Sequence, residues 1–402
     1  MDAYLLEWVN LLLRWTHLIV GIAWIGASFY FVWLDNHLVA PTDADLQAKG
    51  VGGELWAVHG GGFYNPQKYR LAPAQIPPQL HWFYWEAYST WLSGFALLCL
   101  MYYGAPTLYL IDPAVAALSP LQAVAIGVAT LVGGWLVYDA LCRSPLGRDL
   151  NRLAIVLALL LAAAAYGLCS VFSGRGAFLH FGAMLGTMMV GNVFFVIIPG
   201  QRAMVAAAAR GEAPDPRNAV RAKQRSVHNT YFTLPVLLMM ISNHYAFTYG
   251  APHHKWLVLI ALCLAGAAIR VWFVERHKAH ERGGRTSPLA LIIGIGLIAA
   301  VIVALRPAPP AATAAASVLP FDRVQTIIQA RCVSCHAEHP AQAGFVTAPK
   351  GQMFDTPERI LAQTASIRAQ LVSRAMPIGN LTQMTDDERA AVIAWIDAGA
   401  PH

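Results

Sequence analysis

The segment Cys332-Val333-Ser334-Cys335-His336 places two thiols and an imidazole where all three could reach one haem. C-x-x-C-H is the attachment signature of a c-type haem. The two thiols would form thioethers with the porphyrin, and His336 would ligate the iron. The alternative is a redox-active or chance C-x-x-C pair. The motif therefore predicts an electron carrier whose C-terminal part lies outside the bacterial cytoplasm, where haem is attached covalently.

The sixth iron ligand is expected to be a methionine. Met376 precedes Pro377 in an irregular segment after a predicted helix and is the preferred candidate. Met353 and Met384 are its rivals, and loop packing is the alternative role for Met376. Ligation by His and Met raises the haem potential, which suits an electron acceptor.

Residues 321–402 are expected to form a small, class-I-like cytochrome c domain of three helices. The first helix ends in the haem motif, and the second begins at Thr356, with Pro357 in its first turn. The third begins at Thr385, with Glu388 completing a capping box, and stops near the C-terminus. A core of this size is marginal alone, so a bound haem would complete it.

The composition predicts a membrane domain before this cytochrome. Apolar residues make up 57% of the 402 residues, and charged residues only 12%. Such a composition indicates a polytopic membrane protein in a lipid bilayer. Long apolar runs predict eight transmembrane helices at residues 5–33, 82–103, 119–141, 152–172, 178–199, 230–249, 256–274 and 287–305. We expect an all-α, eight-helix bundle over residues 1–305 and an Ala/Pro-rich linker over residues 306–320.

Basic residues orient this bundle. Lys and Arg concentrate in alternate loops, whereas the opposite loops hold only Arg175 and Lys255. The positive-inside rule places the basic loops in the cytoplasm, so both termini face the periplasm of a bacterial inner membrane. The haem motif requires the same side for the C-terminus. The net charge of +6 is therefore explained without a nucleic-acid partner.

Several histidines lie in or at the ends of predicted spans. His17, His180 and His244 are candidates for the iron of a b-type haem, because intramembrane ionisable residues are usually functional. Arg14 shares a helix face with His17 and could contact a haem propionate. The alternative is that each imidazole bonds to a neighbouring helix. On the cytoplasmic side, His81 and His228 could ligate a second haem b, bind substrate or reach the membrane interface.

The loop at 34–81 contains a second constellation. It carries HGGGFYNPQKYR at residues 59–70 and leads into HWFYWE at residues 81–86. Three glycines beside aromatic and amide side chains would allow the backbone to approach a small planar ligand, although the segment is not a P-loop. The alternative is an ordered turn followed by an interfacial aromatic belt. Glu86 at the start of a span needs a partner or a role.

Together these segments resemble the membrane-bound, cytochrome-c-linked urate oxidases (urate hydroxylases) of bacteria. The resemblance rests on RWTH at 14–17 with WIG at 24–26, on residues 56–66, on HWFYWEAY at 81–88, and on a haem domain containing Met376. It covers nearly the whole chain. It implies that urate is oxidised to 5-hydroxyisourate, with water supplying the oxygen atom. Electrons would leave through the haem c to a respiratory acceptor, such as a terminal oxidase or a soluble cytochrome c.

The substrate that the resemblance implies allows a hypothesis about the residues that bind it, although no catalytic residue is carried over from the family. Urate is a planar monoanion near neutral pH, so its site needs cationic or N–H donors, a stacking surface and a base. The hypothesis assigns these roles to Arg70, Tyr64, Asn65, Trp82 and Glu86.

A cytoplasmic urate site would require one or two intramembrane haems b, because a hydrocarbon core of ~30 Å is too wide for a single electron-transfer step. A periplasmic site would require none. The alternative functions are a quinol- or dehydrogenase-linked membrane cytochrome and a transporter fused to a cytochrome.

Overall fold

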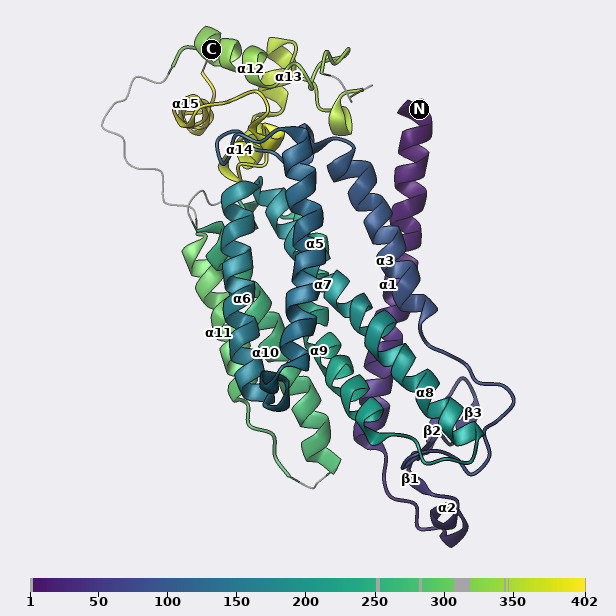
Figure 1. The fold of residues 1–402 in the computed structure, drawn as a ribbon. Helices are drawn as coiled ribbons and strands as arrows, with labels where there is room; N and C mark the ends of the chain where they lie inside the picture. Colours follow the sequence, from purple (N-terminus) through teal and green to yellow (C-terminus); the bar gives the residue numbers. More distant parts are fainter. Residues whose placement is uncertain are drawn as a thin grey trace.

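The computed structural model describes residues 3–250, 254–281, 284–306, 319–342, 345 and 347–401. It is mostly helical, at 70%. Long helices form a bundle with a small helical domain over one end (Figure 1). The helix α1 (Ala3–His37) begins at that same end, as the predicted even number of crossings requires. Of the expected linker, residues 307–318 lie outside the described part.

Helices occupy all eight positions at which spans were predicted. After α1, the bundle contains α3 (Trp85–Leu98), α5 (Pro120–Arg143), α6 (Leu150–Val171), α7 (Gly174–Gly191), α8 (Ile198–Ala209), α9 (Pro216–Ile241), α10 (Lys255–Glu281) and α11 (Leu289–Ala304). Two π-helical turns extend these helices: η1 (Cys99–Tyr103) continues α3, and η3 (Asn192–Ile197) joins α7 to α8. A short helix, α4 (Pro106–Tyr109), caps the end of η1.

Not all of these helices have the length and hydropathy of a membrane span. Among the described residues, five do: Tyr4–His37, Pro120–Arg143, Leu150–Val171, Gly174–Ala209 and Lys255–His277. The helices at the other three predicted positions are shorter or more polar. Five apolar helices support a membrane protein, and the full set of eight spans stays a prediction.

The centre of the bundle is formed by α7. It packs on α5, α6 and α9, and its aromatic side chains Phe178 and Phe181 are completely buried. α1 lies at the side of the bundle, along α3 and α10. Its contact with α3 is close, since a Cβ on Gly94 would come within 2.8 Å of the Cε1 atom of His17. The RWTH segment on α1 and the HWFYWE segment, which leads into α3, therefore belong to two helices that pack against each other.

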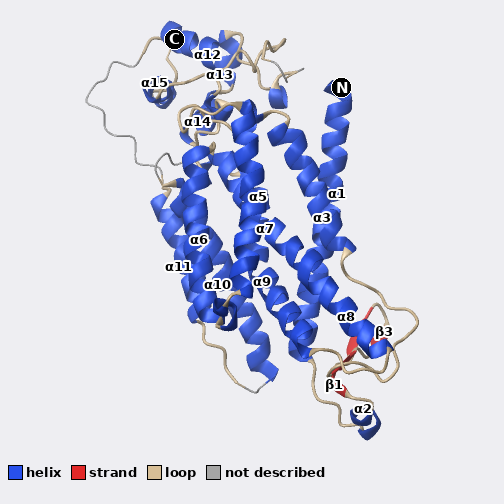
Figure 2. Ribbon diagram, viewed as in Figure 1, coloured by secondary structure: helices blue, strands red, loops and turns tan. Residues whose placement is uncertain are grey.

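The loop after α1 contains β-strands, which an all-α prediction does not include. It contains α2 (Ala44–Ala48) and four short strands that form two antiparallel pairs at the end of the bundle opposite the helical domain (Figure 2). The pairs are β1 (Val51–Glu54) with β4 (Gln67–Tyr69), and β2 (Ala57–His59) with β3 (Gly62–Tyr64). The all-α description was wrong for this segment, because strands of three or four residues are too short to give a periodic sequence signal.

The C-terminal domain contains α12 (Phe321–Arg331), α13 (Pro357–Ala362), α14 (Thr364–Val372) and α15 (Asp386–Asp397). The predicted N-caps are confirmed: Thr356 accepts a bond from the Arg359 N–H, and Thr385 forms a capping box with Glu388. The expected second helix is divided at Gln363 into α13 and α14. Trp395 is completely buried in the small core between these helices.

Candidate functional sites

The C-x-x-C-H motif lies in a tight turn that begins at the end of α12. The backbone N–H groups of Cys335 and His336 both donate to the Cys332 carbonyl, at 3.2 and 3.0 Å. The His336 Nδ1 lies 2.8 Å from the Gln352 carbonyl oxygen. Donation to this carbonyl fixes the imidazole tautomer and leaves Nε2 available for iron. These residues fit a covalently attached haem.

One observation disfavours a redox role for this motif. Burial raises the pKa of the Cys332 thiol to about 12, whereas a redox-active C-x-x-C pair needs a lowered thiol pKa. Haem attachment is therefore the chemistry that this turn supports best.

Met376 follows α14 in an irregular segment, as predicted. Its carbonyl accepts a 2.7 Å bond from the guanidinium of Arg389, which is only 7% exposed and also donates to the Leu371 carbonyl. The rival Met384 is buried in the domain core. The backbone of Met376 is thus fixed by a buried cation, and its role as iron ligand stays a prediction.

The C-terminal domain rests on the end of the bundle through residues on both sides of Met376. Gly379 has a φ of +55°, and a Cβ there would come 3.0 Å from the Ile111 carbonyl oxygen and 3.2 Å from that of Leu108. A Cβ on Gly250 would lie 2.2 Å from the Ser373 carbonyl oxygen. Backbone therefore packs directly on backbone at two points, and both points favour glycine.

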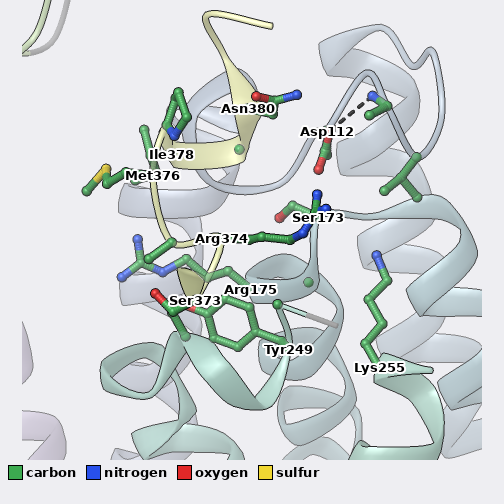
Figure 3. A pocket seen from close by; sticks show the side chains of 18 of the residues that line it. Asp112, Ser173, Arg175, Tyr249, Lys255, Ser373, Arg374, Met376, Ile378 and Asn380 are labelled. Carbon is green, nitrogen blue, oxygen red and sulfur yellow. Dashed lines mark hydrogen bonds between the residues drawn. The ribbon is translucent and has the colours of Figure 1, made fainter. Parts of the chain in front are cut away.

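A cavity of about 1470 Å³ lies between the two domains. Figure 3 shows Asp112 and Lys255 entering it from the membrane domain, and Met376 at its edge with the sulfur turned away from both. Arg175 and Arg374 also line it. The predicted iron-ligand segment thus forms part of the boundary between the domains.

Two of the predicted intramembrane histidines are held by neighbouring groups. His17 Nδ1 lies 3.1 Å from both the Thr90 carbonyl and the Ser93 hydroxyl of α3. His180 is completely buried, with Nδ1 2.9 Å from the Gly176 carbonyl and Nε2 3.2 Å from the Tyr103 hydroxyl. Among the hydrogen bonds described, the two rings share no partner. That they face one haem stays a prediction.

The other candidate ligands are dispersed. Arg14 donates to Asn10 and lies 2.7 Å from the Met101 sulfur. His244 is exposed in a turn after α9, and His81 is exposed before α3. His228 is on α9, where its Nδ1 lies 2.8 Å from the Tyr138 hydroxyl.

The predicted substrate residues do not form a single contact set among the described residues. Asn65 supports the strand pairs by donating to Glu54, and Tyr64 is 52% exposed on β3. Arg70 directly follows β4. Trp82 packs near the start of α3, where the buried Oε2 atom of Glu86 has no hydrogen-bond partner in the described structure. The unpartnered Oε2 atom agrees with the expectation that Glu86 needs a partner or a role, and which of these it has stays a prediction.

Sequence reasoning did not find a buried polar network on α5, η3 and α9. Asn192 donates to the Tyr138 hydroxyl at 2.9 Å and to Asn229 Oδ1 at 2.8 Å. Arg225 donates to Asn192 Oδ1 and to Asp139, the latter at 2.7 Å. Polar residues in otherwise apolar spans were the available signal, but their pairing depends on the tertiary fold.

Comparison with known protein families agrees with the division of the chain into a helical bundle and a C-terminal domain. Residues 320–396 match the family described as Cytochrome C oxidase, cbb3-type, subunit III, so the C-terminal unit is a cytochrome c domain. No curated protein and no solved structure matches the chain significantly. Residues 3–306, which include every helix of the bundle, match the family described as Urate oxidase N-terminal. The chain therefore belongs to the urate oxidase N-terminal family, joined in one polypeptide to a cytochrome c domain.

Proposed function

We propose that this protein is a membrane-bound oxidoreductase that converts urate to 5-hydroxyisourate and passes the electrons to its own haem c. The observation that carries the proposal is the fusion of a urate oxidase family domain to a cytochrome c domain. Urate and water give 5-hydroxyisourate, two protons and two electrons. Molecular oxygen is not needed in this balance, because water supplies the oxygen atom and a cytochrome takes the electrons.

The haem c would be attached through Cys332 and Cys335, with His336 and Met376 as the iron ligands. When bound, it supplies a one-electron acceptor that is used twice per urate. The chain holds the His336 ring through Gln352 and the Met376 carbonyl through Arg389. From this haem, electrons would pass to a respiratory acceptor, either a terminal oxidase or a soluble cytochrome c.

The proposal places the protein in a bacterial inner membrane with the cytochrome domain in the periplasm. The alternation of basic loops and the site of covalent haem attachment support this orientation. The residues proposed for urate chemistry, Trp82 and Glu86 foremost, then lie at the cytoplasmic end of the bundle.

Electrons from that end would need an intramembrane carrier to reach the periplasm. We include one or two haems b in the proposal, with His17 and His180 as the first candidate ligands and His81, His228 and His244 as the others. The Nδ1 contacts of His17 support this choice, because a ring held through one nitrogen presents the other to a ligand. At His180 the haem iron would replace the Tyr103 hydroxyl at Nε2. A pyridine haemochrome spectrum of the purified protein should contain b-type and c-type bands; a c-type band alone would eliminate the relay.

Product analysis in labelled water tests the proposed reaction. The purified protein is incubated anaerobically with urate and an oxidised soluble cytochrome c in ¹⁸O-water. We expect one labelled oxygen in 5-hydroxyisourate and two reduced cytochromes per product molecule. Reduction by a quinol or a dehydrogenase, with no response to urate, would instead support the alternative of a membrane electron carrier.

A further inference from the structure

A second cavity, of about 580 Å³, lies at the end of the bundle opposite the cytochrome domain. Its walls come from α1, the segment at 71–83, η3, α8 and α9. This volume is within the usual range for small-molecule sites, about 300–1,000 Å³, whereas the interdomain cavity exceeds it. Of these two spaces, the smaller one has the dimensions of a substrate pocket.

The walls of this cavity suit a flat, polar ring. Trp24, Phe31, Trp82 and Phe83 supply aromatic surfaces, on which a planar ligand can stack. Trp24 and Trp82 pack in the same cluster as Ala87, which adjoins Glu86 in the first turn of α3. Glu86 therefore adjoins this cluster in the chain, although its side chain does not line the cavity.

Asn229 supplies a polar group that is fixed before any ligand arrives. It lines the cavity, is 7% exposed, and donates one N–H to the Met189 carbonyl at 3.1 Å. Its Oδ1 accepts one bond, from Asn192. An amide side chain has two N–H donors and two acceptor positions, so one of each is unused within the described part of the chain. Since Arg225 holds Asn192 in turn, the amide is preorganised.

A lysine that is paired with an aspartate lies at the rim of the cavity. Asp35 forms ion pairs of 2.7 Å with both Lys223 and Lys68, so two ammonium groups share one carboxylate. Lys223 and Asp35 line the cavity, whereas Lys68 does not. The Lys223 ammonium has three N–H donors and gives one of them to Asp35 in the described structure, so it keeps donors for an anionic ligand.

We infer that this cavity is the urate-binding site, in which the aromatic side chains stack on the purine rings, Asn229 bonds to the ring edge, and Lys223 attracts the anion. The inference rests on the proposed function and deepens it. Asn192, Arg225 and Asp139 act as positioning residues behind Asn229. In this proposal the interdomain cavity is a space between two docked domains, and urate does not bind there.

Two lysine variants test the site with a matched control. Lys223→Gln and Lys68→Gln each remove one of the two ammonium groups that pair with Asp35. The two lysine side chains are similarly exposed, at 63% and 57%. We expect Lys223→Gln to raise the KM for urate about twofold to fivefold, in keeping with one exposed charge contact, and Lys68→Gln to leave it unchanged. Asn229→Asp, which preserves shape but places a carboxylate against an anion, should reduce kcat/KM on the order of 100-fold. Haem content and reduction by dithionite report whether each variant is intact.

The outcomes separate this inference from the proposed function. If urate does not reduce the haem of the unmodified protein, the proposed function fails. If urate reduces it, but both lysine variants behave alike and Asn229→Asp keeps full activity with intact haem, the site is wrong. A loss of urate affinity confined to Lys255→Gln, in the interdomain cavity, would also overturn the inference.

Discussion

Substitution of Gly379 by alanine should separate the docking of the cytochrome domain from its folding. The added Cβ would lie 3.0 and 3.2 Å from two carbonyl oxygens of the membrane domain, at Ile111 and Leu108. The neighbours must shift by a few tenths of an ångström, and overpacking of this kind costs about 1–3 kcal/mol. This cost applies only when the domains are docked. The ratio of docked to undocked molecules therefore falls roughly 5- to 150-fold.

Gly399→Ala is the matched control. Gly399 is in the same domain and has a φ of +90°, and a Cβ there would meet no heavy atom of the described residues within 4 Å. At either position, alanine in a left-handed backbone conformation lowers the free energy of unfolding by about 1–2 kcal/mol. Only Gly379→Ala adds a contact with the membrane domain.

The assay is anaerobic stopped-flow measurement of haem c reduction after mixing with urate. The rate follows the docked fraction, so we expect Gly379→Ala to slow it by up to the factor above and Gly399→Ala to leave it near the original value. Dithionite should reduce both variants fully. This expectation assumes that haem c receives its electrons while the two domains are docked as described. Equal rates for the two variants would refute that assumption.

Three further predictions concern single side chains. Glu86→Gln should abolish urate-dependent haem reduction without changing haem content, and normal turnover would remove Glu86 from the mechanism. Met376→Leu should lower the midpoint potential of haem c, whereas Met384→Leu should affect only stability; the reverse pattern in a redox titration would exchange their roles. Hydrogen bonds from Arg331 lower the pKa of Glu388, so this pair stabilises the cytochrome domain above about pH 4 and the effect disappears as the pH falls further. Glu388→Gln should cost about 1 kcal/mol at neutral pH and reduce the acid sensitivity, as thermal unfolding at several pH values would report.

Local sequence signals predicted the parts of the structure that depend on neighbouring residues. The haem turn at Cys332 and the helix caps at Thr356 and Thr385 need only a few adjacent side chains, and they form as expected. The break between α13 and α14 at Gln363 was not predicted, since no glycine or proline marks it. Apolar runs also gave the positions of the bundle helices, because burial in lipid requires them.

Tertiary contacts account for what the sequence did not predict. Asn192 and Asn229 are far apart in the chain, and nothing in their spacing indicates a hydrogen bond between them. The same limit applies to the cavity, whose walls come from segments that are far apart in the chain. Trp82 was predicted as a stacking surface and does line it. Tyr64 and Asn65, from the neighbouring motif, instead belong to the strand pairs on the surface.

Anaerobic titration of the purified protein with urate tests the central claim most directly. Each urate should deliver two electrons, so the absorption bands of reduced haem c should appear without oxygen and reach their maximum at a fixed ratio of urate to haem. Haem c that stays oxidised in excess urate, while dithionite reduces it fully, would contradict the claim that the membrane domain oxidises urate and its own cytochrome accepts the electrons.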